Sequence, residues 1–126
     1  MYILIFKFLD ALDEVTLLSW NKKSIKFLFH ILDSPGHGRI YGSTGDFWPD
    51  GCPCMKEDSK ILTEINNSKI IYHVAPLTSA LNIMLREFEK YVKVIKIDLD
   101  NKIPFEQAIS DCVCDILNDS ELTIIK

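Results

Sequence analysis

The sequence has no apolar run long enough to cross a bilayer. Residues 1–9 are mostly apolar, but they lack the basic leader and the small-residue cleavage site of a secretory signal. Its 14 Lys and Arg residues are scattered, and the formal net charge is -4, which disfavours binding to nucleic acid. The four cysteines form two C-x-C pairs, which without a signal indicates free thiols in a reducing compartment. We therefore expect a cytoplasmic protein that binds neither nucleic acid nor a membrane.

Several catalytic motifs are also missing. The sequence has neither the Gly-Lys-Ser/Thr end of a phosphate-binding P-loop nor the G-x-G-x-x-G of a dinucleotide-binding loop. The five glycines are therefore expected to permit tight turns. No G-x-S-x-G nucleophile elbow is present either. These absences leave catalysis uncertain and make a non-enzymatic role the expected one.

The chain does carry the pattern of one α/β domain. Its 126 residues are 48% hydrophobic and 25% charged, which is ordinary for a globular fold of this size. Apolar periodicity predicts strands alternating with helices, which specifies a parallel sheet with right-handed crossovers. The expected strands are 25–32, 70–75 and 93–99, and the expected helices are 10–20, 56–66, 78–91 and 102–117. We expect residues 121–126 to form a short strand or a tail.

The strand at residues 25–32 is the centre of this pattern, because a Gly- and Pro-rich loop follows it directly. Ligands of open α/β sheets bind just beyond the carboxyl ends of the strands, where Asp33 and Ser34 lie. A carboxylate beside a hydroxyl can hold Mg²⁺, although Asp33 could equally cap the turn through backbone N–H groups. His30 and His73 fall within strands and are expected to be packed or edge histidines.

The loop itself, residues 33–54, supplies the other candidates. Aromatic side chains in a polar loop either contact a partner or pin the loop to its own domain, and the sequence leaves both roles open for Tyr41, Phe47 and Trp48. His37 with Cys52 and Cys54 matches no common zinc spacing. Ser34, His37 and an Asp at position 46 or 50 are residue types that a hydrolase uses, which keeps that alternative open.

The same loop resembles the centre of a von Willebrand factor type A domain, of the branch found beside atypical alpha-type protein kinases. The resemblance rests on LDSPGHG at 32–38, Tyr41 and DFWPDG at 46–51, with ALDEV at 11–15 and LSW at 18–20 upstream. It covers residues 9–117 and implies the carboxyl half of such a domain. We therefore expect residues 1–126 to form a single truncated type A domain with a Rossmann-like, three-layer fold and a small, mostly parallel sheet.

In the resembled family the residue equivalent to Asp33 belongs to a metal-ion-dependent adhesion site. That site also needs Asp-x-Ser-x-Ser and a Thr from other loops, and Asp-x-Ser-x-Ser occurs nowhere in this chain. Asp33 and Ser34 are thus an incomplete site, and no cofactor beyond weakly held Mg²⁺ is expected. No kinase motif is present in the chain.

The resulting expectation is a protein-binding module that uses the loop after the central strand. The expected partner-binding residues are His37, Tyr41, Asp46, Phe47, Trp48 and Asp50. Two alternatives stay open. One is a small hydrolase or metal-dependent enzyme using Asp33, Ser34 and His37, and the other is a fragment of an alpha-kinase-associated protein without a function of its own.

The resemblance also predicts an open sheet edge. In the resembled fold the strand order is 3-2-1-4-5-6, and this chain would supply only the last three. Residues 25–32 would then lack a neighbour, which invites pairing with another chain. We expect residues 2–9 to substitute for the missing strand, or the chain to associate with itself through this edge. A helical face through Leu4, Phe8, Ala11 and Val15 is the competing prediction for that segment.

Overall fold

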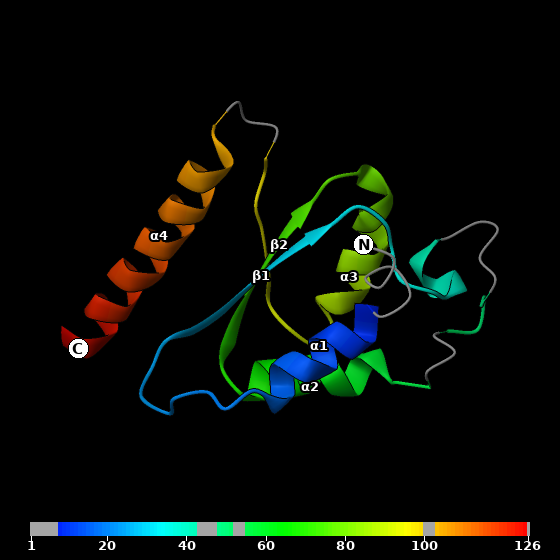
Figure 1. Cartoon of the computed structure of the whole chain (residues 1–126), viewed down its shortest axis with the longest axis horizontal. Helices are drawn as coiled ribbons and strands as arrows, with labels where there is room; N and C mark the ends of the chain where they lie inside the picture. Colours follow the sequence, from blue (N-terminus) through cyan, green and yellow to red (C-terminus); the bar gives the residue numbers. More distant parts are fainter. Residues whose placement is uncertain (1–7, 43–47, 52–54, 100–102, 126) are drawn as a thin grey trace. The chain divides into compact units, whose positions relative to one another are not determined.

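The computed structural model describes residues 8–42, 48–51, 55–99 and 103–125 (Figure 1). The chain divides into two compact units, Met1–Lys96 and Ile97–Lys126. The first unit holds the sheet and the loop that follows residues 26–32. The second holds one long helix.

The first unit is built on three parallel strands, β1 (Lys26–Leu32), β2 (Ile70–Pro76) and β3 (Val94–Lys96), in the order β1-β2-β3. Lys26 lies opposite Ile70 and Leu32 opposite Pro76, so β1 and β2 pair over their whole length. β3 pairs only over three residues, from Val94 opposite Tyr72. The expected α/β, Rossmann-like fold with a small parallel sheet is confirmed, and the strands follow the predicted order. β3 is shorter than the predicted 93–99.

The helices α1 (Phe8–Leu17), α2 (Asp58–Asn67) and α3 (Asn82–Phe88) enclose a single hydrophobic core with the sheet. Apolar residues recur at helical spacing in each, which is why one side of every helix is buried. Alternate residues of β2 enter the same core, because successive strand side chains point to opposite faces. The fully buried residues with the largest side chains are Tyr72, Phe88, Leu12, Leu62, Ile65, Leu81, Met84, Leu85 and Val74.

Helix ends follow local polar chemistry. Thr78 caps the 3-10 helix η2 (Ser79–Leu81) that leads into α3, since its hydroxyl accepts the Ala80 N–H at 3.1 Å. At α2 the residue at the cap position is Glu57. Asp58 begins the helix and accepts the Ser59 N–H at 2.8 Å.

The amino-terminal prediction needs a correction. α1 begins at Phe8, so Phe8 and Leu9 belong to a helix and not to a substitute strand. The reason is periodic packing: Leu9 and Leu12 lie three residues apart, and both are buried in the core. Residues 2–7 lie outside the described part of the chain, and their strand pairing stays a prediction.

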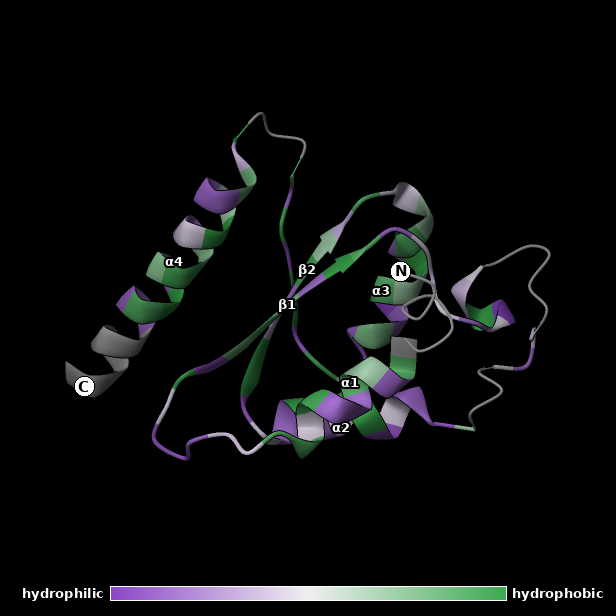
Figure 2. Ribbon diagram, viewed as in Figure 1, coloured by the Kyte–Doolittle hydropathy of each residue, from purple (hydrophilic) through white to green (hydrophobic). Residues whose placement is uncertain are grey.

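The second unit contains α4 (Phe105–Ile125), which is longer than the predicted 102–117. Pro104 directly precedes the helix, and its carbonyl accepts the N–H groups of Gln107 and Ala108 at 2.9 and 3.1 Å. Residues 121–125 are helical, which corrects the prediction of a strand or tail. Figure 2 shows hydrophobic and hydrophilic segments alternating along α4. Within the described helices no segment has the length and hydropathy to span a membrane.

Candidate functional site

The loop after β1 is held to the end of the sheet by backbone hydrogen bonds. The Leu32 carbonyl accepts the Leu77 N–H at 2.8 Å, which joins the ends of β1 and β2. Farther along, the Gly36 N–H points to the sulfur of Met84 on α3 at 3.2 Å. The 3-10 helix η1 (Arg39–Tyr41) follows, and the Arg39 N–H donates to the Pro49 carbonyl at 2.8 Å. The two limbs of the loop are therefore tied together.

Tyr41 fixes this loop to the domain. Its side chain is 3% exposed, its ring meets that of Phe88 edge to face at 5.9 Å, and its hydroxyl donates a hydrogen bond to the Asp58 carboxylate. Burial raises the pKa of Tyr41 far above its usual range, and the hydrogen bond to Asp58 and the charge of that carboxylate add to the rise. Burial and these contacts fit the pinning role, one of the two that the sequence left open for this ring. The partner-binding role of Tyr41 stays a prediction.

His37 and Trp48 form the outer part of the loop. Their ring centroids are 4.7 Å apart with the planes at 67°, and both side chains are half-buried. The packing joins the start of the loop to its second limb, because the two residues are eleven positions apart in the sequence. Asp50 follows and is exposed. Asp46, Phe47, Cys52 and Cys54 lie outside the described residues.

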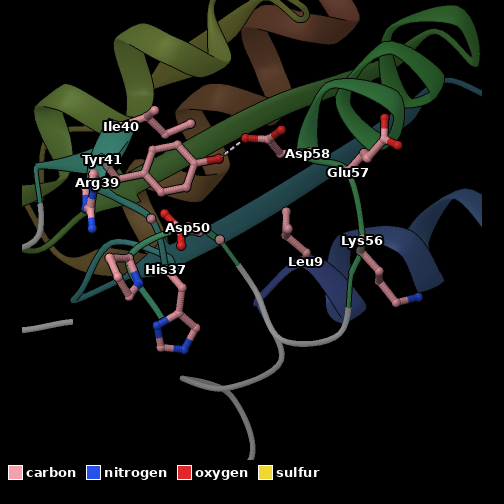
Figure 3. Close-up of a pocket in the computed structure, with 12 residues that line it drawn as sticks. Leu9, His37, Arg39, Ile40, Tyr41, Asp50, Lys56, Glu57 and Asp58 are labelled. Carbon is pink, nitrogen blue, oxygen red and sulfur yellow. Dashed lines mark hydrogen bonds between the residues drawn. The ribbon is translucent and has the colours of Figure 1, made fainter. Parts of the chain in front are cut away.

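A hollow of about 460 Å³ opens between this loop and the amino-terminal ends of α1 and α2 (Figure 3). We refer to it as the loop hollow. Its lining includes Leu9 and Tyr41, which are buried, and the more exposed side chains of Arg39, Asp50 and Glu57. The complete lining is Leu9, His37, Gly38, Arg39, Ile40, Tyr41, Pro49, Asp50, Gly51, Lys56, Glu57 and Asp58. A lining with both apolar and charged side chains suits a ligand that has both kinds of group.

The two cations of the loop hollow differ in what they bind. Lys56 Nζ lies 2.5 Å from Asp13 and 3.4 Å from Asp10, so it is engaged by α1. These contacts raise the pKa of Lys56, the hydrogen bond to Asp13 most of all. The exposed Arg39 side chain makes no hydrogen bond or ion pair within the described residues. Arg39 is thus the cation available to a ligand, and its five donors suit a carboxylate or phosphate.

The candidate metal ligands lie at the carboxyl end of β1, as the sequence predicted. Asp33 is exposed, and the Ser34 hydroxyl lies 3.4 Å from its carboxylate oxygen. In the described part of the chain, no three His, Cys, Asp or Glu side chains come together as a metal would require. Ser34 makes no hydrogen bond to His37 there. The metal role of Asp33 and Ser34 stays a prediction, with one carboxylate and one hydroxyl present.

The strand histidines are packed inside, as expected. His30 Nδ1 lies 2.8 Å from the Tyr72 hydroxyl, and burial lowers the pKa of His30 to about 4. His73 is 2% exposed and packs on Phe29 with ring centroids 5.0 Å apart, and burial lowers its pKa as well. Both rings are therefore neutral at neutral pH and belong to the interior of the first unit. The His30–Tyr72 pair was not predicted.

Two features of the site escaped sequence analysis. Arg39 was not among the predicted site residues. Its position could have indicated it, because it is a cation two residues after His37 in the loop that follows the carboxyl end of β1. The hollow also needs α1 and α2 beside the loop, and the approach of Leu9 and Glu57 cannot be predicted from local patterns. Tertiary packing alone brings these segments together.

Comparison with known proteins gives one informative similarity. The chain is 29% identical over 86 residues, or 68% of its length, to a protein named alpha-protein kinase vwkA from Dictyostelium discoideum. The aligned part is only 14% of that protein. No protein-family model matches the chain, and no solved structure matches it. The chain is thus weakly similar to a short part of a much longer alpha-protein kinase.

Proposed function

We propose that this chain is a protein-binding module, the carboxyl half of a von Willebrand type A domain, and that it binds its partner at the loop hollow. The observation that carries the proposal is Arg39, an exposed guanidinium without a side-chain partner in the described residues, in the lining of a hollow that has both apolar and charged side chains. Arginine and aromatic side chains dominate the binding energy of protein interfaces.

The rigidity of the loop supports the same proposal. Tyr41, the Gly36–Met84 contact and the Arg39–Pro49 hydrogen bond hold the loop in one arrangement before any partner arrives. A preorganised surface loses less conformational entropy on binding than a mobile one. These contacts hold the described parts of the loop that contain Arg39 and Pro49.

Weak similarity to a protein named alpha-protein kinase vwkA supports the assignment at a coarser level. The resemblance of residues 9–117 to a type A domain of the branch found beside alpha-type kinases agrees with the similarity to alpha-protein kinase vwkA. The order β1-β2-β3 is the one that a type A domain has in its second half. No kinase motif occurs in this chain, so an interaction role fits it better than a kinase one.

Affinity capture with charge-reversal variants tests the proposal. The immobilised chain is exposed to extracts, retained proteins are identified, and the dissociation constant of each is measured with purified components. Arg39→Glu should weaken the specific partner at least about tenfold, which is about 1.4 kcal/mol. Trp48→Ala should weaken it more than it lowers the free energy of unfolding.

Lys22→Glu is the matched control, because it makes the same charge change at an exposed residue in the turn before β1. The control should bind as the wild type does. If Arg39→Glu and Lys22→Glu retain every protein with equal affinity, the loop hollow is not the binding site. If Trp48→Ala only lowers the melting temperature and folded molecules bind normally, Trp48 is structural.

A further inference from the structure

Three carboxylates of the described chain line the loop hollow, and they differ in what they contact. Glu57 forms an ion pair with Lys60, whose Nζ lies 3.0 Å from the carboxylate oxygen. Asp58 accepts the hydrogen bond from the Tyr41 hydroxyl. The exposed Asp50 carboxylate makes no hydrogen bond or ion pair in the part of the chain that the structure describes. Asp50 is therefore the carboxylate of the hollow that is available to a ligand.

Arg39 and Asp50 lie on the two limbs of the loop, which a backbone hydrogen bond joins. The Arg39 N–H donates to the carbonyl of Pro49, the residue before Asp50, at 2.8 Å. Both side chains are exposed and belong to the lining, and no ion pair joins them among the described residues (Figure 3). The hollow thus offers one positive and one negative group from neighbouring points of the backbone. A complementary ligand carries a carboxylate and also an ammonium or guanidinium group.

Apolar side chains also line the hollow and add a third requirement. Ile40 is 59% exposed, and Pro49 is half-buried. Gly51 leaves room beside them, since a Cβ built there would meet no atom within 4 Å. An apolar ligand group that contacts Ile40 and Pro49 is removed from water, which favours binding. The volume of about 460 Å³ is in the range of sites that hold small ligands, so it suits a short segment of a partner chain.

We propose that the partner inserts a short peptide segment into the loop hollow, with an acidic residue for Arg39, a basic residue for Asp50 and an apolar residue against Ile40. The inference rests on the proposed function and adds the chemistry of the partner. A peptide carries all three groups on one chain, and its carboxylate can accept two parallel hydrogen bonds from a guanidinium. A purely acidic segment would bring a like charge to Asp50, and a purely basic one would do so to Arg39. Such like-charge contacts exclude the wrong partners.

Selection from a library of random short peptides tests this chemistry. Peptides recovered on the immobilised wild-type chain should be enriched in Asp or Glu and in Lys or Arg, close to an apolar residue. On Arg39→Glu the acidic enrichment should disappear while the basic one remains, and on Asp50→Lys the reverse should happen. Lys22→Glu makes the same charge change as Arg39→Glu outside the hollow, and should return the wild-type pattern.

A synthetic peptide with the recovered consensus gives the decisive measurement. Its dissociation constant should rise at least about tenfold on Arg39→Glu. Replacing the acidic residue of the peptide by lysine should weaken binding to the wild type and restore binding to Arg39→Glu. A merely structural role of Arg39 would not produce that rescue.

Three results would overturn the inference: no peptide is enriched, the recovered peptides lack one of the two charges, or Arg39→Glu leaves the affinity of the consensus peptide unchanged. Affinity capture separates this failure from that of the proposed function. If captured proteins still depend on Arg39, the loop hollow remains the binding surface and the peptide chemistry alone is wrong. If capture is also independent of Arg39, the proposed function fails as well.

Discussion

Removing the hydroxyl of Tyr41 tests how strongly the loop after β1 is fixed. Tyr41→Phe keeps the ring, which is 3% exposed and packs on Phe88, so the buried apolar area hardly changes. What is lost is the hydrogen bond that the hydroxyl donates to the Asp58 carboxylate. A hydrogen bond to a charged group contributes about 1.5–3 kcal/mol. Because Asp58 is half-buried and water can replace part of the contact, we expect a loss of about 1.5 kcal/mol in the free energy of unfolding.

A double-mutant cycle isolates this contact from the rest. The free energy of unfolding is measured by urea titration for the wild type, Tyr41→Phe, Asp58→Asn and the double variant. The two single changes should not add, and the coupling energy should be about 1 kcal/mol or more. Asp58→Asn also alters the first turn of α2, where Asp58 accepts the Ser59 N–H, and the cycle cancels that contribution. Additive effects, with a coupling energy near zero, would refute the pinning role of Tyr41.

The remaining predictions concern protonation, backbone conformation and metal. The pKa of His30 is about 4 in the folded chain against an ordinary 6.5, so stability should be full above pH 6.5 and fall by roughly 3 kcal/mol between pH 6.5 and 4. His30→Gln should flatten that part of the urea-midpoint profile, and an unchanged slope would contradict the assignment. Lys69 has a φ of 57° after α2, so Lys69→Gly should raise the free energy of unfolding by about 1 kcal/mol. Gly42→Ala should lower the same quantity, because φ is +75° and the new Cβ would lie 2.6 Å from Ile83 Cδ1; stabilisation by alanine would show that this turn is wrong. Calorimetric titration with Mg²⁺ should show no submillimolar binding, and saturable binding that Asp33→Ala abolishes would mean a complete site.

Strong periodic patterns were sufficient to predict most of the fold. The mostly apolar runs before Asp33 and up to Pro76 became β1 and β2, which pair in parallel. β2 is largely buried, whereas β1 is mostly half-buried. Element ends were harder. α1 starts at Phe8 because Leu9 and Leu12 enter the core together, and strand and helix patterns coincide in an aromatic-rich segment. α4 continues to Ile125 although no pattern beyond residue 117 required it.

The candidate site was predictable in position but only partly in composition. The rule that ligands bind beyond the carboxyl ends of parallel strands located the loop after β1. Whether Tyr41 faced outward or inward could not be decided locally, since the answer depends on Phe88 and Asp58, which are contributed by α3 and α2. Arg39 gains its importance only because Leu9 and Glu57 approach the loop from elsewhere in the chain. Sequence patterns do not encode such distances directly.

The most direct test of the central claim is a hydrogen-exchange footprint of the complex with the protein that the wild-type chain captures. Backbone amides in residues 36–42 and 48–51, which surround the loop hollow, should become more protected when that protein is added. The same amides in Arg39→Glu should stay at their free values under identical concentrations. Protection confined to other segments, with residues 36–42 and 48–51 unchanged, would contradict the proposal that this loop is the binding surface.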